Sequence, residues 1–345
     1  MEKVEGIIVG QGLAGTLLAY ELSLRDKKVV IIDADEEQTS SKIAAGIYNP
    51  ITGRKMVKTW LADEMFPPLP KYYQRLEQLT GSRFLHPISI YRPFAAAEEQ
   101  NDWQTKAHDS QHRAYISKLH QKHAGIEGIR DEAGGLMLNV SGYVDLPTCL
   151  RAMREFFLAK GMLHTELFLH DKLTVSSNEV RYGDVEANWI VFCEGPKVMD
   201  NPFFRSLRFR PVKGELIGIQ TGKELKHIVN RGVFMIPKRD FVQVGSTYDH
   251  QKLDWEPSER GVQQLQDRLR KLFSGQYEIV NRQAGVRPAT FDRRPYVGML
   301  QKTPRIGIFN GLGTKGVSLG PHFAQLMTKH LIDGTPLPEE VSIER

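Results

Sequence analysis

The chain has 345 residues, of which 41% are hydrophobic and 25% charged, and its formal net charge is +5. This length is enough for two domains with sizeable cores, and no apolar run approaches the roughly 18–20 residues that span a bilayer, which excludes a membrane-spanning protein. The start of the chain lacks a signal-peptide pattern, and the two cysteines, Cys149 and Cys193, cannot build a disulfide framework, so the expected location is a reducing cytoplasm.

The first 33 residues have the pattern of a dinucleotide-binding βαβ unit. Apolar residues predict a buried strand over 4–9, a helix with one apolar face over 16–25 and a second strand over 28–33. In the Gly-x-Gly-x-x-Gly turn between strand and helix, the glycines permit the turn, admit a pyrophosphate and let the helix pack on the strand. Asp33 ends the second strand, where a carboxylate binds ribose hydroxyls, which disfavours NADP and leaves FAD and NAD open. The residues expected to bind the nucleotide here are Gly10, Gly12, Leu13, Ala14, Gly15, Asp33 and Ala34.

A second glycine-rich loop, residues 311–316, lies near the other end of the chain. It follows the apolar run 306–309 and precedes a helical pattern that continues from Pro321 to Ile332, so it also predicts a strand, a tight turn and a helix. Each helix start presents N–H groups and a partial positive charge to an anion. Two such loops far apart in the chain favour one extended dinucleotide held by both, and FAD fits best. The residues expected to contact it here are Gly311, Gly313, Thr314, Lys315 and Gly316.

The middle of the chain predicts further elements. A polar-faced helix is expected over 60–79, and a second helix over 145–160 has Asp145 as its N-cap. Small residues over 40–50, including Ala45 and Gly46, are expected to pass beside the isoalloxazine ring or the pyrophosphate, although an ordinary loop would have the same composition. Strands are expected over 86–94, 135–140, 188–195, 215–219, 232–236 and 241–245, the last three without intervening helices.

These elements predict an α/β fold, with a Rossmann-like FAD-binding domain and a substrate domain built on a mixed or antiparallel β-sheet. The FAD-binding domain is expected to be discontinuous, formed by residues 1–58, 141–206 and 284–345. The substrate-binding domain is expected to consist of residues 59–140 and 207–283.

Two polar clusters permit more than one interpretation. The basic run 205–213 suits an anionic partner such as RNA, but without a nucleic-acid motif a solvated strand edge with one cofactor contact is favoured. His108 and His112 have i, i+4 spacing, with His120 and His123 close behind, which can bind a metal. Their polar neighbours indicate a solvated face instead, so we predict no metal site.

The block 285–298 carries the most specific pattern, Gly-Val-Arg-Pro followed by Pro-Tyr-Val-Gly. Together with the two glycine loops, this block resembles the FAD-dependent amine and amino-acid oxidase superfamily of D-amino acid oxidase, glycine oxidase and sarcosine oxidase. The resemblance covers nearly the whole chain in order, including the Ala45-Gly46 turn, the strand ending at Gly195 and the run 211–214. The segment 311–320 also resembles the oxidase domain of the bacterial enzyme that matures 5-methylaminomethyl-2-thiouridine in tRNA.

The resemblance implies roles for several residues. Arg287, in the Gly-x-Arg-Pro motif, would grip the substrate carboxylate, because a guanidinium matches a carboxylate with two donors; the alternative is an ion pair with an acid at the domain interface. Lys315 would add charge near the flavin or help dioxygen accept electrons, unless it is solvent-exposed. Tyr248 and Tyr296 are candidate pocket hydroxyls, or packed aromatics. The resemblance adds Ala45, Gly46, Gly195, Gly285 and Arg287 to the expected cofactor contacts.

The implied reaction oxidises the C–N bond of a small amine or amino acid. A hydride passes from carbon to flavin N5, water hydrolyses the imine and dioxygen reoxidises the flavin. No cysteine follows Cys193, so the late cysteine that tethers flavin in sarcosine oxidase-type relatives is missing and the FAD is expected to be non-covalent. The alternatives are a tRNA wobble-uridine (carboxymethylaminomethyl) modification oxidase, with tRNA as partner, and a flavin dehydrogenase that does not use oxygen.

Overall fold

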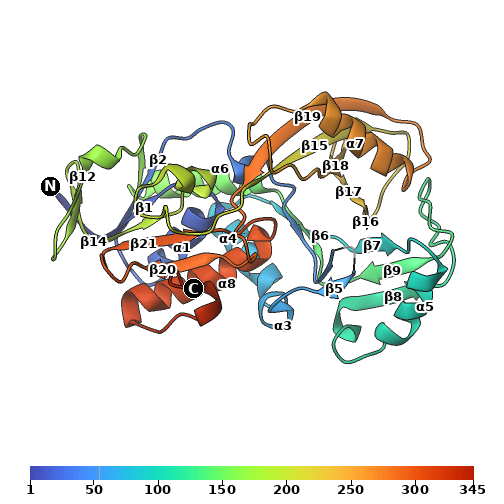
Figure 1. Ribbon diagram of the computed structural model, residues 1–345, viewed down its shortest axis with the longest axis horizontal. Coiled ribbons are helices and arrows are strands. Elements are labelled where there is room, and N and C mark those ends of the chain that lie inside the picture. The colour runs from blue at the N-terminus through green and yellow to red at the C-terminus, as the bar shows by residue number, and fades with distance from the viewer. Residues whose placement is uncertain (54) are drawn as a thin grey trace.

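A mostly parallel sheet forms one half of the protein, in a computed structural model that describes residues 1–53 and 55–345 (Figure 1). Its strand order is β11-β2-β1-β14-β13-β12, with β21 beside β14 and β20 beside β21. The strands are β1 Glu2–Val9, β2 Val29–Asp33, β11 Leu163–Thr165, β12 Leu173–Val175, β13 Val180–Tyr182, β14 Val185–Phe192, β20 Tyr296–Met299 and β21 Ile306–Asn310. Five neighbouring strands, β11, β2, β1, β14 and β21, run parallel to one another. This confirms the predicted Rossmann-like arrangement.

Helices α1 (Leu13–Ser23) and α8 (Gly316–Asp333) pack against each other beside this sheet (Figure 1). Both start directly after a glycine loop, three and five residues before the predicted helix patterns at 16 and 321. A Cβ at Gly320 would lie 2.6 Å from Leu17 Cδ1, so the glycine permits the close approach of the two helices.

A second sheet lies at the other end of the molecule, with strand order β19-β15-β18-β17-β16-β7-β9-β8 (Figure 1). Its strands are β7 Ile90–Pro93, β8 Ile116–His120, β9 Gly135–Leu138, β15 Val212–Gln220, β16 Ile228–Arg231, β17 Val233–Pro237, β18 Val242–Gly245 and β19 Glu278–Arg287. All pairings are antiparallel except the parallel pair of β16 and β7, which confirms the prediction of a mixed sheet.

Helix α7 (Glu259–Arg270) packs on the outer face of this second sheet, where Val262, Leu265 and Leu269 meet the apolar side chains of β15, β17 and β18. This helix, and α5 (Ala97–Lys106), were not predicted. The predicted helix over 60–79 is two helices, α3 (Ala62–Met65) and α4 (Leu69–Thr80), because Pro67 and Pro68 interrupt the helical hydrogen bonds.

A small sheet of β3 (Ile47–Tyr48), β10 (Gly142–Val144) and β6 (Leu85–Pro87) and the hairpin of β4 (Ile51–Thr52) and β5 (Val57–Lys58) connect the halves. Helix α6 (Leu146–Ala159) follows β10, and Asp145 caps it as predicted by accepting a hydrogen bond from Thr148 N at 3.4 Å. The remaining short elements are α2 Ser40–Ile43, η1 Arg113–Tyr115, η2 His170–Lys172, η3 Gly195–Asp200 and η4 Glu339–Val341.

One apolar cluster contains Leu17 of α1, Val144 of β10 and Ile236 of β17, so the two halves share a core. The predicted division into three FAD-binding and two substrate-binding segments therefore stays a prediction. Within residues 1–53 and 55–345, no helix has both the length and the apolar character that crossing a bilayer requires.

Candidate functional site

The first glycine loop makes a tight turn at the carboxyl end of β1. Gly10 has φ +97°, and a Cβ there would lie 2.7 Å from the carbonyl oxygen of Cys193. A Cβ at Gly15 would lie 1.9 Å from the carbonyl oxygen of Gly10, so only glycine fits both positions. Gly12 precedes α1 and supplies no side-chain cap, while Leu13 N donates to Ser41 Oγ at 3.1 Å. Gly12 itself supplies no cap, so apart from the Ser41 contact the N–H groups at the start of α1 suit a pyrophosphate.

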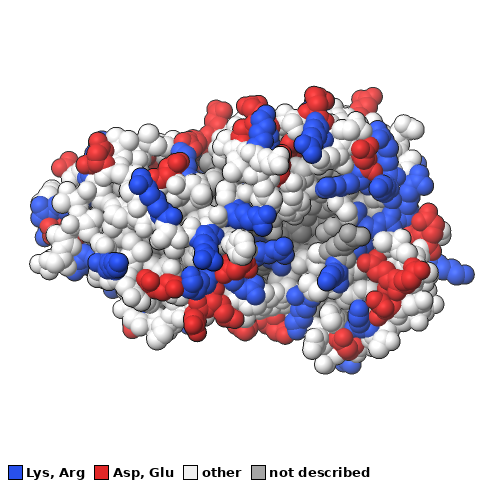
Figure 2. Space-filling model, viewed as in Figure 1, with Lys and Arg blue, Asp and Glu red and all other residues white. Residues whose placement is uncertain are grey.

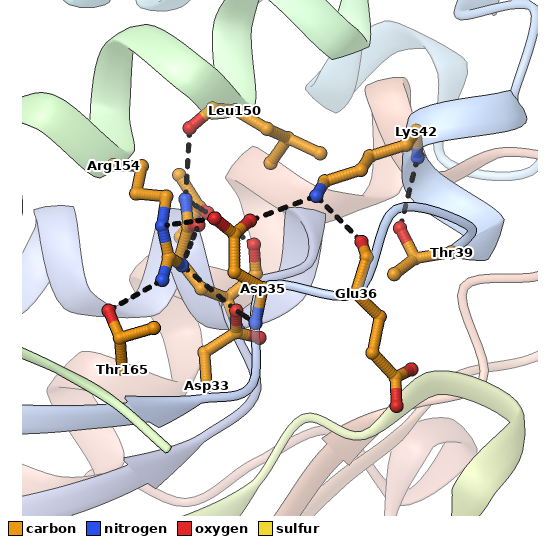
Figure 3. A network of polar contacts seen from close by, with 10 residues as sticks. Asp33, Asp35, Glu36, Thr39, Lys42, Leu150, Arg154 and Thr165 are labelled. Atoms are coloured by element: carbon orange, nitrogen blue, oxygen red, sulfur yellow. Dashed lines mark hydrogen bonds and ion pairs between the residues drawn. The ribbon is translucent and has the colours of Figure 1, made fainter. Parts of the chain in front are cut away.

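At the end of β2, the Asp33 carboxylate lies in a polar network (Figure 3). Its Oδ2 accepts from Gln11 N at 2.8 Å, and its Oδ1 accepts from Arg154 Nη1 at 2.9 Å. Asp33 therefore lies beside the first glycine loop, as a ribose-binding acid should. Ala34 follows it and is half-buried.

The second glycine loop lies beside the first. A Cβ at Gly316 would be 3.1 Å from Leu13 Cδ2, and Gly311 (φ +80°) and Gly313 (φ +55°) turn the chain before α8. Helix α8 has no side-chain cap at its start, where Lys315 is the N-cap residue and Thr314 is exposed. Two helix starts thus face the same region, which suits a cofactor with several negative charges.

The other predicted cofactor residues border the same loops. Asn310 Nδ2, just before the second loop, donates to the Gly195 carbonyl at 2.9 Å. Gly46 has φ +72° and packs on β10, where a Cβ would lie 1.9 Å from Val144 O, and Ala45 precedes it. Gly285 faces α2, since a Cβ there would lie 3.3 Å from Ile43 Cγ2.

The inner face of the second sheet, opposite α7, packs on α2 at Gly285. Strand pairing places Arg287, Gly214, Leu216, Gly245, Phe234 and Gln243 on that face. The Arg287 guanidinium lies over Gly214, where a Cβ would be 1.9 Å from Nη2. Nη2 donates to Ser246 Oγ at 2.8 Å and Nη1 to the Thr247 carbonyl at 3.4 Å, while the Tyr248 ring lies 4.9 Å from the guanidinium carbon.

Arg287 has no carboxylate partner among residues 1–53 and 55–345, so the alternative of an interface ion pair is wrong for the described structure. Burial lowers the pKa of Arg287, which remains charged at neutral pH. Tyr248, which stacks on it, is 61% exposed. An unpaired guanidinium at this depth suits an anionic ligand.

Lys315 points from the start of α8 toward the β4–β5 hairpin. Its Nζ donates to Thr52 Oγ1 at 3.2 Å and to Thr59 Oγ1 at 3.4 Å. Burial, with a smaller effect of the nearby Arg294 and Arg293, lowers the pKa of Lys315 to about 8. The alternative of a solvent-exposed Lys315 is therefore wrong.

The comparison with protein families decides the assignment. The model of the DAO family, described as FAD dependent oxidoreductase, matches residues 6–330. The protein belongs to this family. It is therefore an enzyme whose cofactor is FAD.

Individual relatives and structures agree with the family. The chain is 26% identical to the bifunctional protein ThiO/ThiG of Synechocystis sp., over 95% of this chain and 51% of that protein. It is 21% identical to the tRNA 5-methylaminomethyl-2-thiouridine biosynthesis bifunctional protein MnmC of Hahella chejuensis, over 98% and 58%. The chain thus spans about half the length of these bifunctional relatives. The fold is similar to that of glycine oxidase from Geobacillus kaustophilus, with a TM-score of 0.82, 21% identity and coverage of 100% and 99%.

The described residues of this DAO-family protein fit FAD. Gly10 and Gly15 permit a turn in which a Cβ would collide with backbone, the starts of α1 and α8 lie close together, and Asp33 stands beside the first turn. Gly10, Gly12, Leu13, Ala14 and Gly15 would hold the pyrophosphate, and Asp33 the adenosine ribose. The second loop and the Ala45-Gly46 turn would hold the flavin half.

The structure bears on three further interpretations of polar residues and corrects the one that concerns Lys213. Tyr296 is 4% exposed and its hydroxyl accepts from Arg208 N at 3.1 Å, so it is a packed aromatic and not a pocket residue. Lys213 does not belong to a solvated edge, because it is 1% exposed and pairs with Asp254 at 2.5 Å. His108 and His112 do not share a helix face, since both follow the end of α5 and His112 Nδ1 contacts Asp109.

Two further site residues were missed. Arg154 of α6 binds Asp33, and Gln243 of β18 carries a side-chain oxygen that is buried without a hydrogen-bond partner in the described chain. Strand alternation offers the only sequence indication for Gln243, which stands between Val242 and Val244. Within the same residues, no three metal-ligating side chains cluster in a way that would hold a metal.

Proposed function

We propose that this DAO-family enzyme oxidises the C–N bond of a small amine or amino acid and that Arg287 binds the substrate carboxylate. The observation that carries the proposal is the unpaired guanidinium on the inner face of the second sheet, held by Ser246 and Thr247. A guanidinium has five N–H donors, and these two contacts leave donors free for a carboxylate. A carboxylate held in this way is the group that every amino-acid substrate carries.

The chain's own residues would bind and orient the substrate. Arg287 would fix the carboxylate, the neighbouring Phe234 and Leu216 would supply an apolar wall, and the side-chain oxygen of Gln243 would accept one further hydrogen bond. Lys315 would place a positive charge at the start of α8. When bound, FAD supplies the two-electron oxidation, with dioxygen as the proposed final acceptor. A neutral amine needs no side-chain base, and water completes the hydrolysis of the imine.

Simple carboxylates test the binding role without turnover. The holoenzyme is titrated with acetate and with propanoate while its visible flavin spectrum is recorded. We expect a saturable spectral change in the native enzyme and none in Arg287→Met at the same concentrations. A native enzyme that shows no change, or a variant that titrates like the native enzyme, would contradict the proposal.

A second candidate function is oxidation of a tRNA-borne carboxymethylaminomethyl group. Lys and Arg side chains gather at the centre of one face (Figure 2), and the chain aligns with 58% of the MnmC protein of Hahella chejuensis. The exposed Arg208, Arg210 and Arg293 lie close to Phe291, which is 66% exposed, since Phe291 N donates to Arg208 O and Arg210 N to Ala289 O. Exposed aromatics among cations suit single-stranded bases.

Salt dependence separates this candidate from the first. A tRNA substrate would bind with an affinity that falls steeply as salt rises from about 50 to 200 mM. Replacing Arg208 and Arg210 by glutamine would weaken that binding while the acetate titration stays unchanged. No tRNA binding at low salt would eliminate the second candidate.

A further inference from the structure

Arg154 reaches from α6 to the end of β2, where the first sheet presents its nucleotide acid (Figure 3). Its Nη1 donates to Asp33 Oδ1 at 2.9 Å and to Gln11 Oε1 at 3.2 Å. Its Nε lies 3.2 Å from Asp35 Oδ2, and its Nη2 donates to Thr165 Oγ1 at 2.8 Å. With 9% of its surface exposed, the guanidinium is almost fully enclosed by these partners.

The guanidinium holds two carboxylates that would otherwise repel each other. Asp33 and Asp35 lie two residues apart, and Asp35 has a left-handed backbone with φ +53° that directs its side chain back toward Arg154. Asp35 Oδ1 also accepts from Lys42 Nζ at 3.0 Å. The planar fork of an arginine can bond both acids at once, which a single ammonium cannot do.

The same contacts fix the orientation of Asp33. With Oδ1 bound to Arg154, Oδ2 turns to Gln11 N at 2.8 Å, inside the first glycine loop. Gln11 is itself tied to α6, since its Nε2 donates to the Leu150 carbonyl at 3.1 Å. The loop, the acid and α6 therefore form one connected network at the adenosine end of the proposed FAD site.

We propose that Arg154 is a positioning residue for the adenosine half of FAD. It acts through Asp33, whose carboxylate it holds in one orientation and bridges to Asp35, so that the carboxylate can receive the ribose hydroxyls. The second glycine loop and the Ala45-Gly46 turn would hold the flavin half, and none of these residues bonds to Arg154 in the described chain. Arg154 thus contributes to the affinity for dinucleotides and not to the affinity for a flavin mononucleotide.

Three ligands and three variants test this role. Protein freed of flavin by dialysis against concentrated bromide is titrated with FAD, with ADP and with FMN, by flavin fluorescence or, for ADP, by competition with FAD. Arg154→Met is expected to weaken the affinities for FAD and for ADP by the same factor, about 10- to 100-fold, and to change the affinity for FMN less than twofold. Arg154→Lys should lose less than Arg154→Met, because it keeps the charge but bonds only one acid at a time. Arg151→Met, at an exposed position one turn earlier on α6, is the matched control and should bind all three ligands like the native protein.

Two results would overturn the proposal. An equal loss of FAD and FMN affinity would mean that Arg154 only maintains the fold, and unchanged FAD affinity would mean that it has no role. If Arg154→Met does not fold, the FAD-to-FMN comparison in Arg154→Lys decides in the same way. None of these measurements involves a substrate, so their outcome is independent of the proposed amine oxidation.

Discussion

Replacing Arg287 by methionine tests the proposed carboxylate site at its main donor. Methionine keeps an unbranched side chain over Gly214 but removes every N–H that a carboxylate could use. A hydrogen bond to a charged group contributes about 1.5–3 kcal/mol. Two bonds to one carboxylate, sharing one anion, therefore amount to about 3–4 kcal/mol, which lowers kcat/KM about 10²- to 10³-fold. The assay compares kcat/KM for N-methylglycine, or for whichever amino acid is oxidised, with that for a related amine without a carboxylate.

The control is Arg282→Met on the same strand. The side chain of Arg282 lies on the opposite face of the strand from that of Arg287, is exposed and contacts Glu259 on the α7 side. Its loss should therefore leave kcat/KM unchanged. The carboxylate-free amine should be oxidised equally by Arg287→Met and native enzyme. Because Arg287 has no anionic partner in the described chain, its removal should also leave the melting temperature unchanged or raise it. A variant that keeps more than a third of the native kcat/KM, or that loses both amines equally, would refute the reasoning.

Three further predictions concern Lys315, Gln243 and the cofactor. With a pKa of about 8, Lys315 is protonated below that pH and neutral above it, so the affinity of the enzyme for a carboxylate should fall as the pH rises through about 8. An acetate titration from pH 6.5 to 9.5 measures this fall, which Lys315→Arg should abolish. Gln243→Leu fills the same space without an amide, so it should lower kcat/KM for the substrate about 10-fold but leave the melting temperature within a few degrees. An unchanged kcat/KM would show that the amide faces neither substrate nor flavin. Acid precipitation should leave the yellow colour in the supernatant, whereas a coloured pellet would show that the FAD is covalently bound.

Local patterns in the sequence predicted the nucleotide half well. Gly10 and Gly15 occupy positions where a Cβ would collide with backbone a few residues away, so their role follows from the turn itself. Asp145 caps α6 through a bond three residues along the chain. Such short-range chemistry is visible in any sequence that carries it.

Contacts between distant segments could not be predicted in this way. Arg154 and Asp33 are 121 residues apart, and nothing local distinguishes Arg154 from Arg151 on the same helix. Lys213 lies in a basic run but is buried, because Asp254 reaches it from 41 residues further along. Helix α7 is different, since its Ser258 cap and the helical spacing of Val262, Leu265 and Leu269 are local signals that the sequence carries, although no helix was predicted there.

The visible spectrum of the purified enzyme under anaerobic conditions tests the central claim most directly. Glycine, N-methylglycine, proline and a set of D-amino acids are added one at a time. We predict that one of them bleaches the flavin absorbance and that Arg287→Met prevents the bleaching at the same concentration. A flavin spectrum that none of these amines bleaches, but that a tRNA substrate does, would contradict oxidation of a small amine or amino acid and favour the second candidate.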